Sequence, residues 1–137
     1  MGVIIDTCIW IEVERGKLAP AEVARLTGGL PIFLTPPVLA ELEYGVYRAT
    51  THEQRIRRMA AIMRIREMPC LTMDKITAET FGRLSATLDS AGKPTLHRVH
   101  DVWIAAIAIQ HRYAVLTRNV KDFEGIPGIR LLRLPGA

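Results

Sequence analysis

The feature that most constrains the fold is an alternation of short apolar runs with longer amphipathic stretches. The runs at 3–5, 32–34 and 114–117 are short, apolar and contain β-branched residues. Such runs are typical of strands that are buried on both faces of a parallel sheet. Weaker strands are expected at 70–72 and 129–132. The alternation therefore predicts an α/β domain around a parallel central sheet.

The stretches between these runs carry apolar residues at helical spacing. Helices are expected near 9–16, 20–28, 36–47, 52–67, 74–91 and 100–112. In the helix at 52–67, the apolar stripe is predicted at Ile56, Met59, Ala60 and Met63. The last helix is apolar nearly all round, so we expect it to be buried on more than one side.

Length and composition are those of one ordinary globular domain. The chain has 137 residues, of which 49% are hydrophobic and 23% are charged, and this balance excludes disordered and collagen-like chains. We therefore expect a single domain over residues 1–137. A formal net charge of +4 permits a polyanionic partner such as nucleic acid without requiring one.

The sequence carries no signal for membrane insertion or secretion. The longest strongly apolar stretch, 102–109, is far shorter than the ~20 residues that a membrane span needs. The N-terminal residues lack the basic region and cleavage site of a secretion signal. Cys8 and Cys70 are the only cysteines, and their spacing predicts neither a zinc site nor a disulfide framework. We expect a cytoplasmic protein with reduced thiols and no membrane partner.

Four acidic residues stand where a parallel sheet gathers its ligands, which is beyond the carboxyl ends of the strands. They are Asp6 after the first strand, Glu41 beside the apolar stripe of its helix, Asp101 at the start of the most apolar helix, and Asp122 after the strand at 114–117. Taken singly, each has a plainer explanation, as a helix cap, a rim carboxylate, a first-turn acid or a loop residue.

Taken together, the four acids predict a metal site. Clustered carboxylates repel one another and raise one another's pKa unless a cation compensates. Ligand sets made only of oxygen suit Mg²⁺ or Mn²⁺. Such an ion lowers the pKa of a bound water and offsets the charge that builds up on a phosphodiester under attack. The pattern therefore indicates metal-dependent hydrolysis of a phosphodiester.

Four segments that contain these acids resemble the PIN-domain family, and within it the bacterial and archaeal toxins of the VapC type. The segments are 4–11, 37–46, 100–108 and 116–123. They occur in the family's order, and the resemblance extends from residue 3 to about residue 133. It implies a three-layer α/β/α sandwich with a mostly parallel central sheet, formed by one PIN domain over 1–137.

The resemblance also implies roles for individual residues. Asp6, Glu41 and Asp101 match the three main acids that hold the metal and support catalysis. The fourth position varies in the family, and either Asn119 or Asp122 fills it here. Asp122 is preferred because it keeps the negative charge.

Residues next to the acids are expected to contact the substrate. Thr7 and Thr117 resemble the small hydroxyl residues that line the family's site, where they position a water or a phosphate. Arg118, Asn119 and Lys121 lie beside the proposed fourth acid and are candidates for contacts with RNA phosphates.

The sequence departs from the family pattern before its third acid, where a loop rich in glycine and proline is common. Residues 96–100 read Leu-His-Arg-Val-His here. His97, Arg98 and His100 are either phosphate-binding residues or solvated loop residues, and both alternatives stay open.

The function that the resemblance implies is a Mg²⁺-dependent endoribonuclease, with Mn²⁺ as an alternative ion, acting as the toxin of a toxin–antitoxin pair. The implied partners are RNA, a cognate antitoxin that covers the active site, and a second copy of the chain in a homodimer. Tyr47, Met59 and Met63 are candidates for the dimer contact. The arginines at 52–67 are either a solvated face or a further RNA contact. The alternative function is a non-catalytic PIN module that binds RNA or a protein.

Overall fold

Four short parallel strands form the central sheet. The computed structural model describes residues 1–134, and its strands are β1 (Val3–Ile5), β2 (Ile32–Phe33), β3 (Ala114–Thr117) and β4 (Arg130–Arg133). Their order across the sheet is β2-β1-β3-β4, and each neighbouring pair is parallel. The central strands β1 and β3 are buried throughout, as expected for strands covered by helices on both faces.

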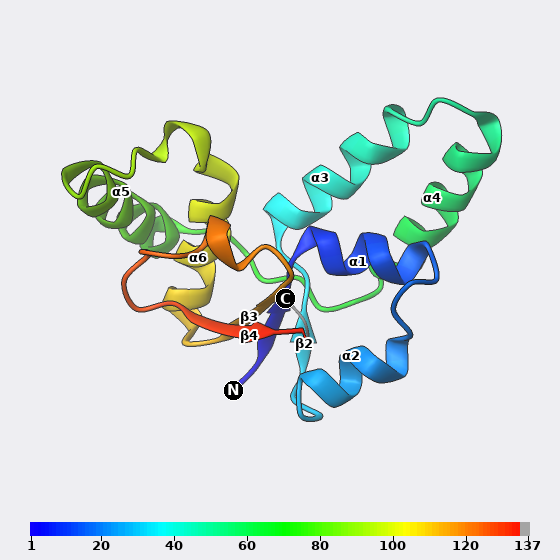
Figure 1. Ribbon diagram of the computed structural model, residues 1–137, viewed down its shortest axis with the longest axis horizontal. Helices are drawn as coiled ribbons and strands as arrows, with labels where there is room; N and C mark the ends of the chain where they lie inside the picture. The colour runs from blue at the N-terminus through cyan, green and yellow to red at the C-terminus, as the bar shows by residue number, and fades with distance from the viewer. Residues whose placement is uncertain (135–137) are drawn as a thin grey trace.

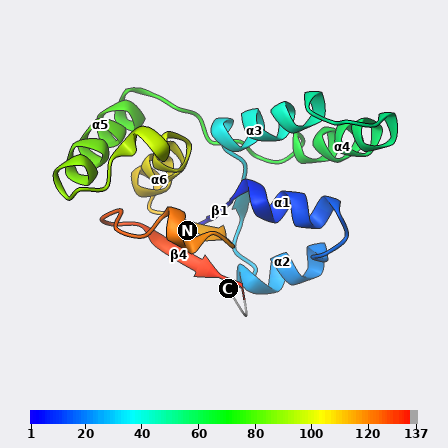
Figure 2. The same ribbon diagram turned by 45° about the horizontal axis from the view of Figure 1, so that its top comes forward.

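Helices make up the two outer layers. The α-helices are α1 (Thr7–Glu14), α2 (Pro20–Leu26), α3 (Pro36–Tyr47), α4 (His52–Ile65), α5 (Lys75–Ser90) and α6 (Val99–His111), and the short 3₁₀ helices are η1 (Thr95–His97) and η2 (Val120–Asp122). In Figures 1 and 2, α5 and α6 lie on one side of the sheet, and α1 and α2 lie on the other. This arrangement confirms the predicted α/β/α sandwich.

The helices α3 and α4 pack against each other and extend past the carboxyl end of β1 (Figure 1). The start of α3 is fixed by Thr35, whose hydroxyl accepts a hydrogen bond from the backbone of Val38, and by prolines at the first two helical positions. None of the helices within residues 1–134 combines the length and the hydrophobicity that crossing a bilayer requires.

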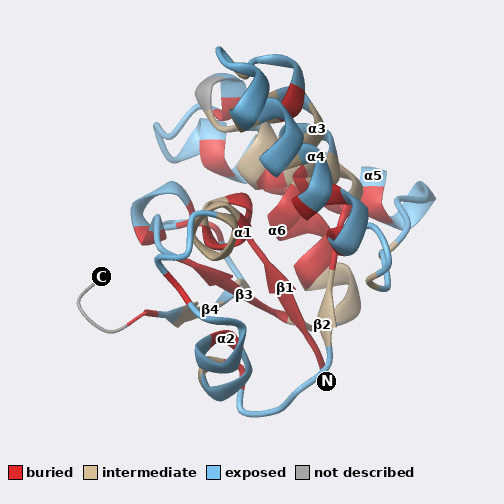
Figure 3. Ribbon diagram, turned by 90° about the vertical axis from the view of Figure 1, so that its right-hand side faces the viewer, coloured by how far each residue is buried: buried red, intermediate tan, exposed pale blue. Residues whose placement is uncertain are grey.

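The core is centred on α6, which confirms the prediction of a helix buried on more than one side. Val102 and the run 104–108 are fully buried, and Figure 3 shows this helix mostly in the colour of buried residues. It packs against α5, α3 and β3. On the α5 side, the rings of Phe81 and Trp103 stack with their centroids 3.8 Å apart. Asp101 therefore projects from a firmly anchored helix.

Two local predictions are wrong. In α4 the buried residues are Ala61, Ile62 and Ile65, whereas the predicted stripe at 56, 59, 60 and 63 is exposed. The helix has apolar residues on two faces, and only its packing against α1 and α3 decides which face is covered. The strand expected at 70–72 is reduced to one parallel bridge between Leu34 and Cys70.

Candidate active site

Asp6 lies at the centre of the site, directly after β1. Its Oδ1 accepts a hydrogen bond from the backbone N–H of Thr7 at 2.9 Å, so the residue is also the cap of α1. Its Oδ2 accepts a hydrogen bond from the Thr117 hydroxyl at 2.7 Å. Ile5 pairs with Leu116 in the sheet, and this register places the residues that follow the two strands side by side. The explanation of Asp6 as a helix cap is therefore confirmed, and its role as a metal ligand stays a prediction.

Asp101 lies in the first turn of α6 and is strongly affected by the other acids. Burial, together with the negative charges of Asp6 and Asp122, raises its pKa from 3.8 to about 6. Burial also raises the pKa of Asp6, although the hydrogen bonds from Thr117 and Thr7 oppose that rise. The structure therefore brings carboxylates from three separate segments close enough to repel one another.

Glu41 reaches the same edge from α3 and meets a histidine there. Its Oε2 lies 2.6 Å from Nε2 of His100 on α6. The contact lowers the pKa of Glu41 and raises the pKa of His100. The Glu41 side chain is 44% exposed, so the rim position considered from the sequence is also correct. His100 thus contacts a candidate metal ligand, which is neither of the two roles considered for it.

The fourth acid lies on the loop after β3. Asp122 is exposed at the end of η2, and its charge acts on Asp101. Asn119, the other candidate, is also exposed, and its backbone N–H donates to the Thr117 hydroxyl at 3.0 Å. Both candidates are therefore exposed, and they differ in that Asp122 carries a negative charge that acts on Asp101. Lys121 is exposed on the same loop and forms no ion pair with any residue from 1 to 134.

Arg118 is paired with a carboxylate on α1. Its Nε and Nη2 donate to the two carboxylate oxygens of Glu12 on α1, at 2.5 and 2.8 Å. A fork of this kind satisfies both oxygens of the acid and holds the guanidinium in one orientation. In this arrangement Arg118 ties β3 to α1, and contact with a phosphate would require the pair to open.

Thr7 has a different environment from Thr117. Its side chain is buried, and its hydroxyl lies near enough to Glu41 to help lower the pKa of that carboxyl, but it makes no well-aligned hydrogen bond to any described residue. A buried hydroxyl without a partner is costly, so this oxygen is available to a ligand atom at the site. Thr117, in contrast, is already committed to Asp6 and to the backbone of residue 119.

Two further residues touch the site: Cys8, which was not predicted to do so, and Arg98, whose contact differs from the two roles considered for it. The thiol of Cys8 lies 3.6 Å from Oδ2 of Asp6, and burial raises the pKa of Cys8. Arg98 donates to the backbone carbonyl of Asp122, 24 residues away in the sequence. Periodicity and spacing carry no signal for a bond over such a separation. The side chain of His97 lies outside the described part of the structure, so the prediction for it stays a prediction.

The donors at this edge suit a hard divalent ion. They are carboxylate oxygens, and their mutual repulsion is what a bound cation would relieve. Within residues 1–134, no three histidine, cysteine, aspartate or glutamate side chains converge closely enough to hold one ion unaided. Magnesium commonly binds through one or two carboxylates and several waters. Asp6 and Asp101 therefore fit such an ion, and Glu41 is at present paired with His100.

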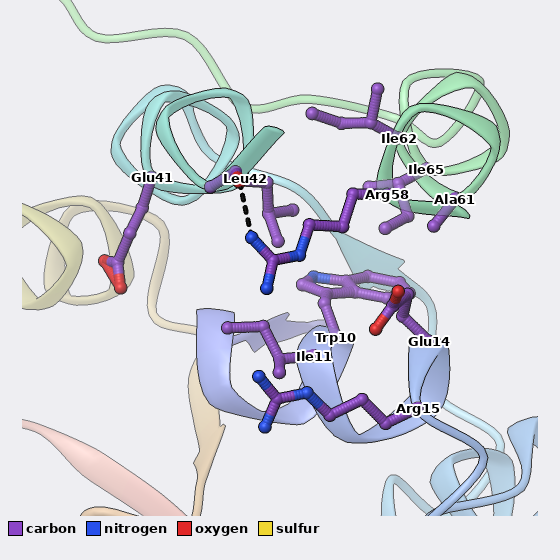
Figure 4. A pocket seen from close by; sticks show the side chains of 11 residues that line it. Trp10, Ile11, Glu14, Arg15, Glu41, Leu42, Arg58, Ala61, Ile62 and Ile65 are labelled. Atoms are coloured by element: carbon purple, nitrogen blue, oxygen red, sulfur yellow. Dashed lines mark hydrogen bonds between the residues drawn. The ribbon is translucent and has the colours of Figure 1, made fainter. Parts of the chain in front are cut away.

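A groove of about 150 Å³ lies between α1 and the α3–α4 pair (Figure 4), and Glu41 is the one of the four candidate acids that lines it. Its walls include Trp10, Leu42 and Ile62, and Glu41 stands at one end. The Arg58 guanidinium extends into the groove and donates to the backbone carbonyl of residue 45 at 2.7 Å. The groove is therefore mainly apolar, with charged groups at defined points.

Comparisons with known proteins agree with this architecture. The family model of the PIN domain matches residues 3–128. The chain is 35% identical over 133 residues to Ribonuclease VapC1 of Rickettsia felis, covering 96% of each protein. It is 32% identical to Ribonuclease VapC5 of Mycobacterium tuberculosis, covering 91% of this chain and 87% of that one. The crystal structure of DNA-bound VapBC from Salmonella typhimurium superimposes with a TM-score of 0.82 and 27% identity, over 97% of this chain and 98% of that one.

Proposed function

Because the chain belongs to the PIN-domain family, we propose that it is a metal-dependent endoribonuclease and the toxin of a toxin–antitoxin pair. Relatives that match it over nearly their whole length are named as VapC ribonucleases. The observation that carries the proposal is that acids from separate segments meet at the carboxyl edge of the sheet, where burial and the charges of Asp6 and Asp122 raise the pKa of Asp101 to about 6. A chain that only binds RNA gains nothing from repelling acids at that place.

Under this proposal, Asp6, Glu41, Asp101 and Asp122 hold Mg²⁺ or Mn²⁺. When bound, the ion lowers the pKa of a water for attack on the phosphorus and offsets negative charge on the phosphodiester. To hold the ion, Glu41 would have to give up its present contact with His100. The carboxylates thus act as ligands and catalytic groups at one place, the edge where β1 and β3 end.

The other residues of the site orient the acids and the RNA. The hydrogen bond from Thr117 fixes the orientation of the Asp6 carboxylate, and a pre-positioned ligand loses less entropy when the ion binds. The free hydroxyl of Thr7 offers a polar contact to a water or a phosphate oxygen. Lys121 and Asn119, exposed on the loop beside Asp122, contact the RNA backbone.

The antitoxin is the second proposed partner. An acidic site attracts a basic side chain, and the groove that ends at Glu41 offers an apolar surface beside it. An antitoxin segment with apolar residues in the groove and a basic residue at the acids would block the access of RNA. We place both partners in the cytoplasm, where RNA is present.

A homodimer is the third part of the proposal. Exposed apolar side chains gather on α3 and α4, including Tyr47 at 78% and Met63 at 67% exposure. Met59 belongs to the same pair of helices and is half exposed. Large apolar side chains grouped on a surface commonly mark a contact with another protein. Light scattering after gel filtration tests this directly, since the monomer mass is 15.3 kDa.

Activity is tested by incubating the purified protein with an end-labelled RNA hairpin in Mg²⁺ and, separately, in EDTA. Glu41→Gln and Asp6→Asn should abolish cleavage. Glu43→Gln is the matched control, because it removes the same charge from the same helix two residues away. We expect Glu43→Gln to retain wild-type cleavage.

Two results would overturn the proposal. One is full cleavage in EDTA, which would remove the metal from the chemistry. The other is RNA binding without cleavage in any divalent ion, which would favour the non-catalytic PIN module. Equal cleavage by Glu41→Gln and Glu43→Gln would show that the negative charge of Glu41 contributes no more to cleavage than that of Glu43.

A further inference from the structure

Arg98 links the two segments that carry Asp101 and Asp122. Its backbone carbonyl accepts the hydrogen bond from Val102 and so begins α6. Its side chain crosses to the loop after β3, where Nε donates to the carbonyl of Asp122 at 3.2 Å and Nη2 donates to the carbonyls of Asp122 and Glu124. Arg98 therefore joins the start of α6, which carries Asp101, to the backbone of Asp122.

The loop after β3 is held by a few buried side chains, and the stretch that carries Asp122 is exposed between them. It runs from Arg118 to the start of β4 at Arg130 and contains only the short helix η2. Val120, Phe123 and Ile126 are buried and anchor the loop, whereas residues 121, 122, 124 and 125 between them are exposed. Among the side chains of the 91–98 connection that the structure describes, which exclude that of His97, only that of Arg98 hydrogen-bonds to this loop.

Repulsion acts against this arrangement. The charge of Asp122 acts on Asp101, and like charges move apart when nothing restrains them. The Arg98 guanidinium opposes that movement because it binds carbonyl oxygens on the loop backbone.

We propose that Arg98 is a positioning residue that fixes the separation between the Asp101 and Asp122 carboxylates and thereby prepares them to hold a divalent ion. This inference rests on the proposed function, and it adds a residue that neither motif spacing nor the acids themselves identify. Arginine suits the role because its planar fork reaches two carbonyl oxygens at once, which a lysine ammonium on a flexible stem does not do with the same geometry.

The test compares Arg98→Ala and Arg98→Lys in the full chain. Lysine keeps the charge but loses the fork, so it separates geometry from electrostatics. Arg25→Ala is the matched control, since it removes one positive charge from an exposed position on α2, on the other side of the sheet from α6. Binding of Mn²⁺ alone is measured by calorimetry, and backbone hydrogen exchange is measured on the metal-free proteins.

We expect both Arg98 variants to bind Mn²⁺ about 10–100-fold more weakly than the wild type, the usual effect of removing a group that orients metal ligands. We also expect faster exchange over residues 119–126 and unchanged exchange in α2. The Arg25 variant should match the wild type in both measurements. Should Arg98→Ala fail to fold, the lysine variant gives the same comparison.

Each contrary result has a distinct meaning. Wild-type Mn²⁺ affinity in both Arg98 variants overturns the positioning role, and so does wild-type affinity in Arg98→Lys alone, since charge would then suffice. Unchanged exchange over 119–126 also overturns it, because the loop would not depend on the fork. If the wild type binds no Mn²⁺, the metal-dependent function itself fails, and the role of Arg98 toward the ion fails with it.

Discussion

Replacing Asp101 with Asn should stabilise the metal-free protein at neutral pH. In the folded state the pKa of Asp101 is raised from 3.8 to about 6, so its ionisation above that pH opposes folding. One pKa unit corresponds to about 1.4 kcal/mol, which sets an upper limit of about 3 kcal/mol. Because the residue is only partly buried, solvent screening reduces the expected gain to about 1–2 kcal/mol. Asparagine keeps the shape of the side chain while removing the charge.

The pH dependence follows from linkage. Below about pH 4 the carboxyl is protonated in both the folded and the unfolded chain, so the wild type and Asp101→Asn should be equally stable. Between about pH 4 and 6 the unfolded chain loses its proton first, and the wild type loses stability relative to the variant. Above about pH 6 the difference should stay constant.

Urea unfolding in EDTA, followed by tryptophan fluorescence at several pH values, measures this difference. Glu79→Gln serves as the control, because Glu79 is an exposed acid on α5 and should show no such pattern. Saturating Mn²⁺ should reverse the order, since an ion at 100 times its Kd stabilises the wild type by about 2.7 kcal/mol. A variant that is less stable than the wild type at pH 7.5, or a difference independent of pH, would refute the reasoning.

Three more predictions concern the structure around the site. Thr117→Val should cost about 1–3 kcal/mol in urea unfolding, because it leaves a buried Asp6 oxygen without its donor. Ile62→Ala should cost about 2–5 kcal/mol, and Met63→Ala less than about 0.5 kcal/mol, because only the first side chain is buried. His100→Gln should lower Tm at pH 6 and leave it unchanged at pH 9, since the raised pKa of His100 means that its ion pair is lost as pH rises.

The controls for these predictions use the same assays. Thr117→Ser keeps the hydroxyl and should restore most of the lost stability. Equal losses from Ile62→Ala and Met63→Ala would mean that the face of α4 assigned to the core is wrong. An effect of His100→Gln that is the same at both pH values would argue against an ion pair as its origin.

Asp6 and Asp101 could be located from the sequence because strand ends and helix starts are local features. Asp6 follows an apolar run, and Asp101 begins an apolar helix. A parallel sheet brings the carboxyl ends of its strands to one edge whatever the details of packing. The expected clustering of the acids needed no knowledge of individual contacts.

The partners of these residues could not be inferred in the same way. Arg118 was a candidate for phosphate binding, and in the fold its guanidinium is paired with Glu12, 106 residues away in the chain. Glu41 was placed correctly at the rim, but its contact with His100 depends on how closely α3 approaches α6. Such pairs depend on side-chain reach between elements, which periodicity does not encode.

Local chemistry alone accounts for the order of strands and helices, the caps that begin them and the edge at which the acids collect, since hydrophobic period and capping act over a few residues. Tertiary packing alone decided which face of α4 is buried, which cations are already paired, and that Arg98 spans two acid-bearing segments. These choices depend on which elements become neighbours, and that is settled by burial of the whole core rather than by any one segment.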